Sequence, residues 1–106
     1  MPIGNFVGTW NNTNKNTGAW IRLEIATKGN MIAVHFFGNC TPTPCDAGTA
    51  MAVYAGNPFI VTADAGFATR KHTLTLTGST LHGTTFTHFT DGSGRADFTS
   101  EDDYTK

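Results

Sequence analysis

Apolar and polar residues alternate along much of the chain with the period of two that is typical of β-strands. The clearest alternation runs through two neighbouring segments, Ala19–Thr27 and Met31–Gly38. Their apolar positions are Ile21, Leu23, Ile25, Ile32, Val34 and Phe36. The turn-forming residues Lys28–Asn30 separate the two segments. The sequence therefore predicts a β-hairpin with one apolar face.

Turn formers divide the rest of the chain into further short segments, a rhythm that is typical of sandwiches and barrels. The predicted strands are Asn5–Asn11, Ala19–Thr27, Met31–Gly38, Thr49–Ala55, Pro58–Asp64, Lys71–Thr77, Thr80–Thr90 and Arg95–Tyr104. Asn12–Gly18 is predicted as a loop, and Gly78–Ser79 as a two-residue hairpin turn. The apolar phase changes between Leu81 and Phe86, which predicts a β-bulge at Gly83.

The composition agrees with an all-β protein. The chain has 19 Thr, 12 Gly and 8 Asn, but only 4 Leu and no Gln, so strand and turn formers replace helix formers. Its 106 residues correspond to one domain spanning 1–106. About eight strands can close a barrel that removes exposed sheet edges. We predict a small antiparallel up-and-down β-barrel, with a β-sandwich as the alternative.

The charge pattern excludes several classes of partner. The formal net charge is -1 and the basic residues are scattered, so no nucleic-acid footprint is present. No apolar run reaches the ~18 residues that indicate a membrane-spanning helix. The start of the chain, Met1–Asn5, shows no signal peptide. The charge pattern does not exclude a homo-oligomer.

The two cysteines, Cys40 and Cys45, flank a loop that Pro42 and Pro44 stiffen. A zinc site would need further ligands, and a redox motif would need two intervening residues rather than four. A disulfide is the favoured interpretation, and free thiols are the alternative. An oxidised pair would place the protein outside the reducing cytosol, secreted or extracellular. Reduced thiols, with no signal peptide visible, would leave a cytoplasmic location open.

The histidines His35, His72, His82 and His88 fall on different predicted strands or far apart on one, so we predict no metal site and no cofactor. They are expected to face solvent or to be hydrogen-bonded. No nucleophile motif is present. An enzyme would have to use Glu24 and a histidine as an acid–base pair.

The polar side of the predicted hairpin suggests a binding surface. Strict alternation places Trp20, Arg22 and Glu24 on one face, and the neighbouring strand adds His35 and Phe37. Aromatic, cationic and acidic groups on one surface suit a small neutral polar ligand. We predict a non-catalytic, lectin-like module that binds carbohydrate through these residues.

The motif Gly8-Thr9-Trp10 resembles the G-x-W start of lipocalins and the G-T-W start of avidin-like proteins. The resemblance implies that Trp10 closes one end of the barrel, against a basic residue late in the chain; Arg95 is the only late arginine. It also implies an alternative function, the carriage of a small apolar molecule inside the barrel. The site would be lined by Ile21, Leu23, Val34, Phe36, Leu74 and Leu76.

A more extensive resemblance covers most of the chain. Besides Gly8-Thr9-Trp10, it includes Cys40 with Cys45-Asp46 and Gly48, and the segment Phe89–Arg95. Together these motifs are similar to a group of small bacterial and fungal domains that have no assigned activity. These domains tend to carry an aromatic residue where Ala47 stands. The resemblance implies a compact, extracellular-type β-domain.

Overall fold

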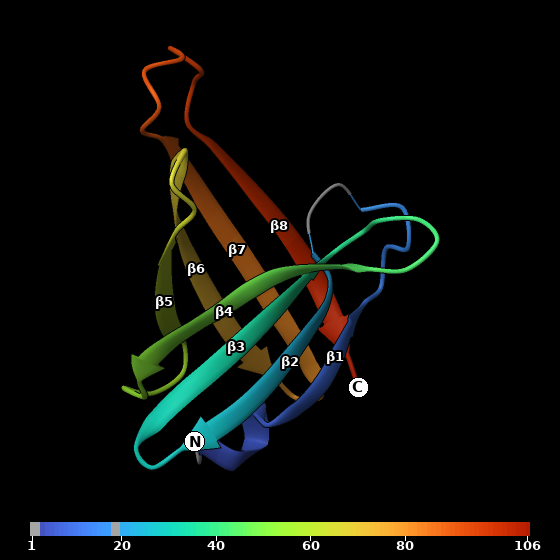
Figure 1. Cartoon of the computed structure of the whole chain (residues 1–106). Helices are drawn as coiled ribbons and strands as arrows, with labels where there is room; N and C mark the ends of the chain where they lie inside the picture. The colour runs from blue at the N-terminus through green and yellow to red at the C-terminus, as the bar shows by residue number, and fades with distance from the viewer. Residues whose placement is uncertain (1–2, 18–19) are drawn as a thin grey trace.

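The computed structural model of the chain describes residues 3–17 and 20–106. These residues form one short 3-10 helix and eight β-strands (Figure 1). The elements are η1 (Ile3–Phe6), β1 (Gly8–Asn12), β2 (Trp20–Lys28), β3 (Met31–Gly38), β4 (Cys45–Val53), β5 (Phe59–Asp64), β6 (Ala68–Thr77), β7 (Thr80–Phe89) and β8 (Phe98–Thr105). Gly18 and Ala19, at the predicted boundary between a loop and a strand, lie outside the described residues.

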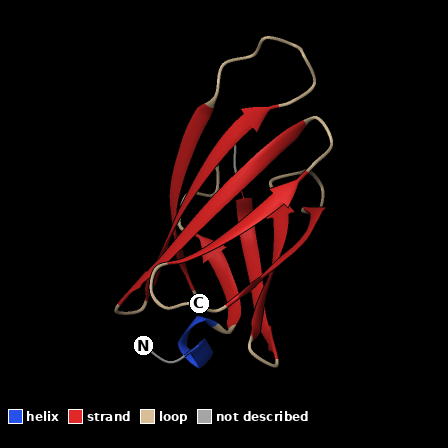
Figure 2. Ribbon diagram, turned by 90° about the vertical axis from the view of Figure 1, so that its left-hand side faces the viewer, coloured by secondary structure: helices blue, strands red, loops and turns tan. Residues whose placement is uncertain are grey.

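The strands wrap into a nearly closed antiparallel barrel, as the sequence predicts (Figures 1 and 2). The order of hydrogen-bonded neighbours is β4-β3-β2-β1-β8-β7-β6-β5. The first and last strands pair at Asn11–Thr105 and Asn12–Tyr104. The sheet edges are therefore β4 and β5, which face each other across a seam without a strand pairing.

The up-and-down order separates two ends of the barrel. The open end, as we define it, carries residues 13–17, 39–44, 65–67 and 90–97 (Figure 1). The closed end carries η1, the turns after β2, β4 and β6, and the C-terminus (Figures 1 and 2). No helix among the described residues has the length and apolar character needed to cross a bilayer.

The closed end is filled by aromatic side chains. Trp10 is buried, and its indole Nε1 donates a 2.8 Å hydrogen bond to the carbonyl of Phe6 in η1. The ammonium of Lys106 lies 4.9 Å from the Trp10 ring centroid. Trp10 thus closes one end of the barrel, but the late basic residue over its ring is Lys106 rather than Arg95. Arg95 lies at the open end, on the ring of Phe89.

Every second residue of each strand points into the barrel. The inward residues of the closed half are mostly apolar and form the core. Its members are between 0% and 6% exposed and include Phe6, Trp10, Leu23, Ile32, Val34, Phe36, Phe59, Leu74, Leu76, Leu81 and Tyr104. The apolar faces predicted for an apolar cargo are largely part of this cluster. Leu23, Val34, Phe36, Leu74 and Leu76 pack into the core.

Gly83 does not form the predicted bulge. The pairing of β6 with β7 is continuous from Thr77–Thr80 to Ala68–Phe89, so Phe86 simply lies on the outer face. The glycine has a packing reason: a Cβ built there would lie 3.0 Å from the Tyr104 ring. Close approach of a ring, rather than a kink, requires glycine at this inward position.

Four strand starts differ from prediction by three or four residues, and two of them are later than predicted. β1 begins at Gly8 rather than Asn5, because η1 takes up Ile3–Phe6, and β8 begins at Phe98 rather than Arg95.

The other two strands begin earlier than predicted. β4 begins at Cys45, four residues before the predicted Thr49, because the disulfide loop runs directly into pairing with β3. β6 begins at Ala68, three residues before the predicted Lys71. The longer β6 is important because it places Arg70 within a strand.

Candidate functional site

Strands β6, β7 and β8 present polar side chains to the interior near the open end. Arg70 pairs with Thr87, and His72 with Thr85. Thr85 pairs in turn with Ser100 on β8, and Asp102 lies two residues further along the same face. Because paired residues share a face of the sheet, these side chains form one continuous surface. We call it the polar wall: Arg70, His72, Thr85, Thr87, Ser100 and Asp102.

Trp20 reaches the same space from β2 because of a β-bulge. Trp20 pairs with Gly38, whereas Arg22 already pairs with Phe37, so β2 contains one extra residue, Ile21. An extra residue shifts the alternation of side chains by one. The Trp20 ring consequently lies inside, with its centroid 5.2 Å from Phe36 and 6.0 Å from His72. The outer-face position predicted for Trp20 is wrong for this reason.

Between Trp20 and the polar wall lies a cavity of about 800 Å³ that opens at the open end. Among its lining residues are Thr17, Trp20, Asn39, Arg70, Thr85, Thr87, Phe98, Ser100 and Asp102. Aromatic rings and hydrogen-bonding groups thus share one concave space. Concave sites of about 300–1,000 Å³ with this mixed lining are typical of small-molecule pockets.

His72 lies at the inner boundary of this region. Its Nδ1 is 2.9 Å from Thr85 Oγ1, and Trp20 Nε1 donates a 3.4 Å hydrogen bond to the same oxygen. The His72 ring stacks on Phe36, with 4.2 Å between centroids. Burial, together with the positive charge of Arg70, lowers the pKa of His72 from 6.5 to about 4. The imidazole is therefore neutral at physiological pH, and hydrogen bonding through Thr85 connects it with the Trp20 indole.

Arg70 is the cation of the cavity. Its guanidinium carbon lies 5.5 Å from the Trp20 ring centroid and 5.4 Å from that of Phe67. Among the described residues it forms no ion pair, whereas Arg22 is paired with Glu24 and Arg95 with Asp91. The half-buried charge of Arg70 thus rests against aromatic rings without a carboxylate partner.

The loops at the opening of the cavity add hydroxyl and amide groups from Thr17 and Asn39. Thr17 donates a 2.9 Å hydrogen bond from Oγ1 to the carboxylate of Asp102. The Asn39 amide donates to the carbonyls of Lys15 and Thr17, at 3.0 Å each. These bonds join the segment after β1 to the disulfide loop, in which Cys40 is bonded to Cys45 with a Cα–Cα distance of 5.5 Å. The opening is therefore held together by both hydrogen bonds and a covalent link.

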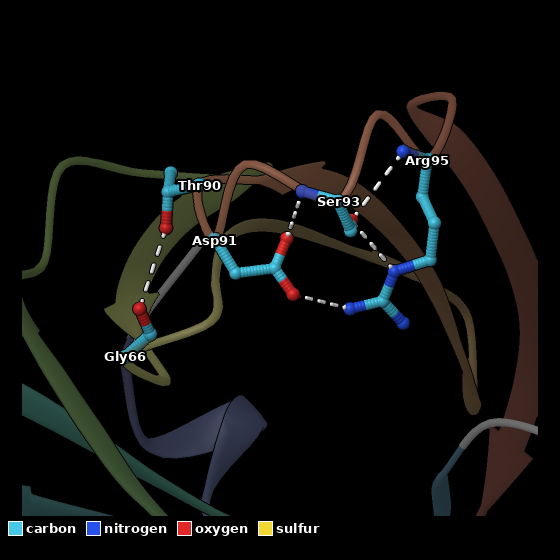
Figure 3. Close-up of polar contacts among 5 residues, drawn as sticks. All are labelled: Gly66, Thr90, Asp91, Ser93 and Arg95. Atoms are coloured by element: carbon cyan, nitrogen blue, oxygen red, sulfur yellow. Dashed lines mark hydrogen bonds and ion pairs between the residues drawn. The ribbon is translucent and has the colours of Figure 1, made fainter.

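A turn held by its own side chains follows β7 at the open end of the barrel (Figure 3). Asp91 accepts a 3.0 Å hydrogen bond from the Ser93 backbone and a 2.7 Å bond from Arg95 Nη2. Hydrogen bonds from Ser93, and then from Arg95, lower the pKa of Asp91 to about 2. Thr90 connects the turn to the loop after β5. Its backbone N–H donates a 2.9 Å hydrogen bond to the carbonyl of Phe67, and its hydroxyl donates a 3.4 Å bond to the carbonyl of Gly66.

Aromatic side chains gather beside this turn. Phe89 and Phe98, on adjacent strands, have ring centroids 5.9 Å apart, and Phe67 stacks against Phe89 at 6.4 Å. The Arg95 guanidinium carbon lies 3.9 Å from the Phe89 ring centroid. Phe67 and Phe98 are about half exposed, at 43% and 50%. Of these rings, Phe98 lines the cavity.

A second, smaller cavity of about 160 Å³ lies at the seam between β4 and β5. Small residues of both edges line it, together with the inward side chains Trp20, Arg70 and His72. Ala47 is one of these small residues. Trp20 and Arg70 therefore contact both the main cavity and the seam.

The other residues predicted to bind ligand stay together on the outer face. Arg22 stacks on Phe37 at 4.1 Å, and the Phe37 ring lies 4.3 Å from that of His35. Glu24 Oε2 is 3.2 Å from Arg22 Nε, while His35 Nε2 is 2.7 Å from Asp46. Glu24 and His35 are register partners, yet each is engaged elsewhere. Four of the five predicted residues form this outer cluster, from which Trp20 is absent.

The four histidines are dispersed, each with its own hydrogen-bond partner. His35, His82 and His88 contact Asp46, Asp103 and Asp97, respectively, each at 2.7 Å on the outside of the barrel. Only His72 is buried. Within the described residues no three metal-ligating side chains gather into a group that could hold an ion.

Several residues of the cavity were missed by the sequence analysis, although one signal was present. His72 shares its parity with Leu74 and Leu76, so it could have been assigned to the inner face. Arg70 has the same parity, but it fell outside the predicted strand. Thr85, Thr87 and Ser100 carry no individual signal in a threonine-rich chain.

Comparison with known proteins adds no identification: the chain matches no family model, no curated protein and no solved structure. Its function must therefore be inferred from the geometry of the barrel and of this cavity.

Proposed function

We propose that this protein is a non-catalytic binding protein that takes one small, ring-bearing molecule into the open end of its barrel. The observation that carries the proposal is the cavity of about 800 Å³ between Trp20 and the polar wall. Eight-stranded barrels are wide enough to hold a single small ligand. The closed half of this barrel is filled by its core, so the ligand would occupy only the outer half.

The lining supports a ligand with both a flat ring and polar substituents. Trp20 and Phe98 provide aromatic surface, while Thr87, Ser100 and Asn39 provide hydrogen-bonding groups. A sugar or a substituted aromatic compound would each use these two kinds of group. Carbohydrate binding therefore remains part of the proposal, with its site inside the barrel instead of on the outer cluster.

Binding is favoured over catalysis by the state of His72. A histidine whose pKa is about 4 is a weak general base at neutral pH. Its Nδ1 is already hydrogen-bonded to Thr85, and its ring is held against Phe36. This arrangement supports a positioning role for the imidazole, which acts on the cavity through the hydroxyl of Thr85.

We also propose an oxidising location, secreted or extracellular, on the basis of the Cys40–Cys45 disulfide. The disulfide loop borders the cavity through Cys40, so oxidation and formation of the open end are linked. Mass spectrometry of the native protein under non-reducing conditions tests the bond, since the oxidised form is lighter by two hydrogens. Two free thiols in protein taken from its source would contradict the proposed location.

The site is tested by NMR with ¹⁵N-labelled protein, whose two tryptophan indole groups report on opposite ends of the barrel. Neutral mono- and disaccharides form one set of probes, and substituted aromatic compounds form the other. We expect a bound probe to shift the Trp20 indole signal and to leave that of Trp10 unchanged. No shift of the Trp20 signal with either set would contradict the proposal.

Two variants distinguish the interior from the outer cluster. Trp20→Leu removes an aromatic wall of the cavity, whereas Phe37→Leu removes the aromatic residue of the outer cluster. We expect binding to fall at least tenfold in Trp20→Leu and to stay within about twofold in Phe37→Leu. The reverse result would place the ligand on the outer face.

A further inference from the structure

The unpaired state of Arg70 indicates which chemical class the cavity binds. All three arginines of the chain contact aromatic rings, but within the part of the chain that the structure describes only Arg22 and Arg95 also pair with a carboxylate. Arg70 differs from them in facing the interior, where it lines both the main cavity and the seam. A cation that is partly removed from water without a counter-ion lowers stability unless a partner is supplied.

The rings around Arg70 compensate for only part of this cost. Its guanidinium carbon lies 5.5 Å from the Trp20 centroid and 5.4 Å from that of Phe67, distances at which cation–π attraction is favourable. Cation–π attraction supplies no acceptor oxygen for the guanidinium N–H groups, and among the described residues Arg70 forms no ion pair. These N–H groups form a planar fork that matches a carboxylate or a related oxyanion.

The carboxylates that line the cavity and the seam do not pair with the guanidinium of Arg70 among the described residues. Asp102 accepts a hydrogen bond from Thr17, and Glu101 lies 3.5 Å from His82 on the outer side of β8. Asp64, which lines the seam, accepts a 2.8 Å bond from the backbone of Gly66. Among the described residues, none of the three forms an ion pair with Arg70.

We propose that the ligand of this cavity is an organic anion, a ring compound whose carboxylate or sulfonate group pairs with Arg70. The inference rests on the proposed function, because it assumes that the cavity is the binding site. The ring of the ligand would lie among Trp20 and Phe98, and the anionic group would reach the arginine beside Trp20. This assignment names the ligand class, and it predicts that a neutral analogue of the same shape binds more weakly.

The test compares two fluorescent probes that differ by one anionic group. Anilinonaphthalene sulfonate carries a sulfonate, and phenylnaphthylamine has the same rings without it. For the unaltered protein we expect the sulfonate to bind at least about tenfold more tightly than the neutral probe, the effect of one charge-assisted hydrogen-bonded pair. The Trp20 and Trp10 indole signals establish in the same samples that each probe lies in the cavity.

Arg70→Gln is the decisive variant, and Lys71→Gln is its matched control. Lys71 is the next residue of β6 and lies exposed on the outer face. The Lys71→Gln substitution removes one positive charge, as Arg70→Gln does. We expect Arg70→Gln to bind both probes equally and Lys71→Gln to keep the preference for the sulfonate. Arg70→Lys keeps the charge without the planar fork, so its preference should be intermediate; it serves as the test if Arg70→Gln does not fold.

The outcomes separate the two proposals. Equal affinity of both probes for the unaltered protein, or a sulfonate preference that Arg70→Gln and Arg70→Lys leave unchanged, would overturn the organic-anion inference. If either probe still shifts the Trp20 signal alone, the proposed binding site stands. If neither probe shifts it, and the sugars do not shift it either, the proposed function fails, and the inference fails with it.

Discussion

His72 Nδ1 lies 2.9 Å from Thr85 Oγ1, inside the barrel and on adjacent strands. The same hydroxyl oxygen accepts the hydrogen bond of the Trp20 indole from across the interior. Thr85 therefore connects the aromatic side of the cavity to the polar wall. This contact holds a neutral imidazole in a place where a charged one would be poorly solvated, and the stability of the fold should depend on pH as a result.

We predict that the free energy of unfolding decreases as the pH falls from about 6.5 to about 4. The pKa of His72 is lowered to about 4, so in this range the unfolded chain takes up a proton that the folded protein does not. The full difference corresponds to about 3 kcal/mol. His72→Asn should keep a group that can bond to Thr85, but it cannot titrate. Urea unfolding at several pH values should therefore show a flatter profile for this variant; parallel profiles would contradict the prediction.

The contribution of the outer-face His82 to stability should change with pH in the direction opposite to that of His72. Hydrogen bonding to Asp103, and then to Glu101, raises the pKa of His82 above 6.5. Its contribution to stability is fully present below pH 6.5 and is lost as the pH rises through the folded pKa. In an NMR titration we expect His82 to titrate well above His72. Asp103→Asn should lower the pKa of His82 and leave that of His72 unchanged, and a His82 pKa that does not move would refute this assignment.

Gly83→Ala should destabilise the fold by about 1–3 kcal/mol, because the interior has no room for a methyl group at this position. The added Cβ would lie 3.0 Å from Tyr104 Cε1 and 3.3 Å from Leu74 Cδ2. Gly4→Ala is the control, since a Cβ at that position would meet nothing within 4 Å. Chemical denaturation should rank Gly83→Ala as the less stable variant. Equal stability of the two would show that the Tyr104 ring moves aside easily.

Removal of the disulfide should have a modest effect on stability and a local effect at the open end. Cys40 and Cys45 are only five positions apart, so a double substitution to Ser should cost about 2 kcal/mol, in line with the small loop. Cys40 lines the cavity next to Asn39, whose amide joins the two loops. The largest amide shift changes should therefore fall in residues 13–17 and 38–45. Changes centred on the closed end, around Trp10, would contradict this picture.

The fold was predictable because its strands are encoded locally. Alternation and turn residues identify all eight strands, although the predicted starts of β1, β4, β6 and β8 are each wrong by three or four residues. Trp10 also behaves as its motif suggests, closing one end of the barrel. The cation above its ring was misassigned, because the contact of Lys106 with Trp10 depends on how β1 and β8 meet.

The predicted binding residues show the limit of local reasoning. Arg22, Glu24, His35 and Phe37 do share a face, as alternation and hairpin pairing require. Trp20 was assigned to that face by the same rule, but the extra residue Ile21 reverses its direction. Nothing in the segment itself marks the bulge, which exists only in the pairing of β2 with β3.

From its sequence alone this protein is an all-β chain of eight short strands, because a period of two and the turn formers act between residues close along the chain. The tertiary structure alone decided where the cavity lies, which side of the sheet carries Trp20, and that Arg70 faces the cavity without a carboxylate partner among the described residues. Those features depend on the register between strands that are far apart in sequence. A shift of one residue in that register exchanges the interior and exterior positions of every side chain beyond it.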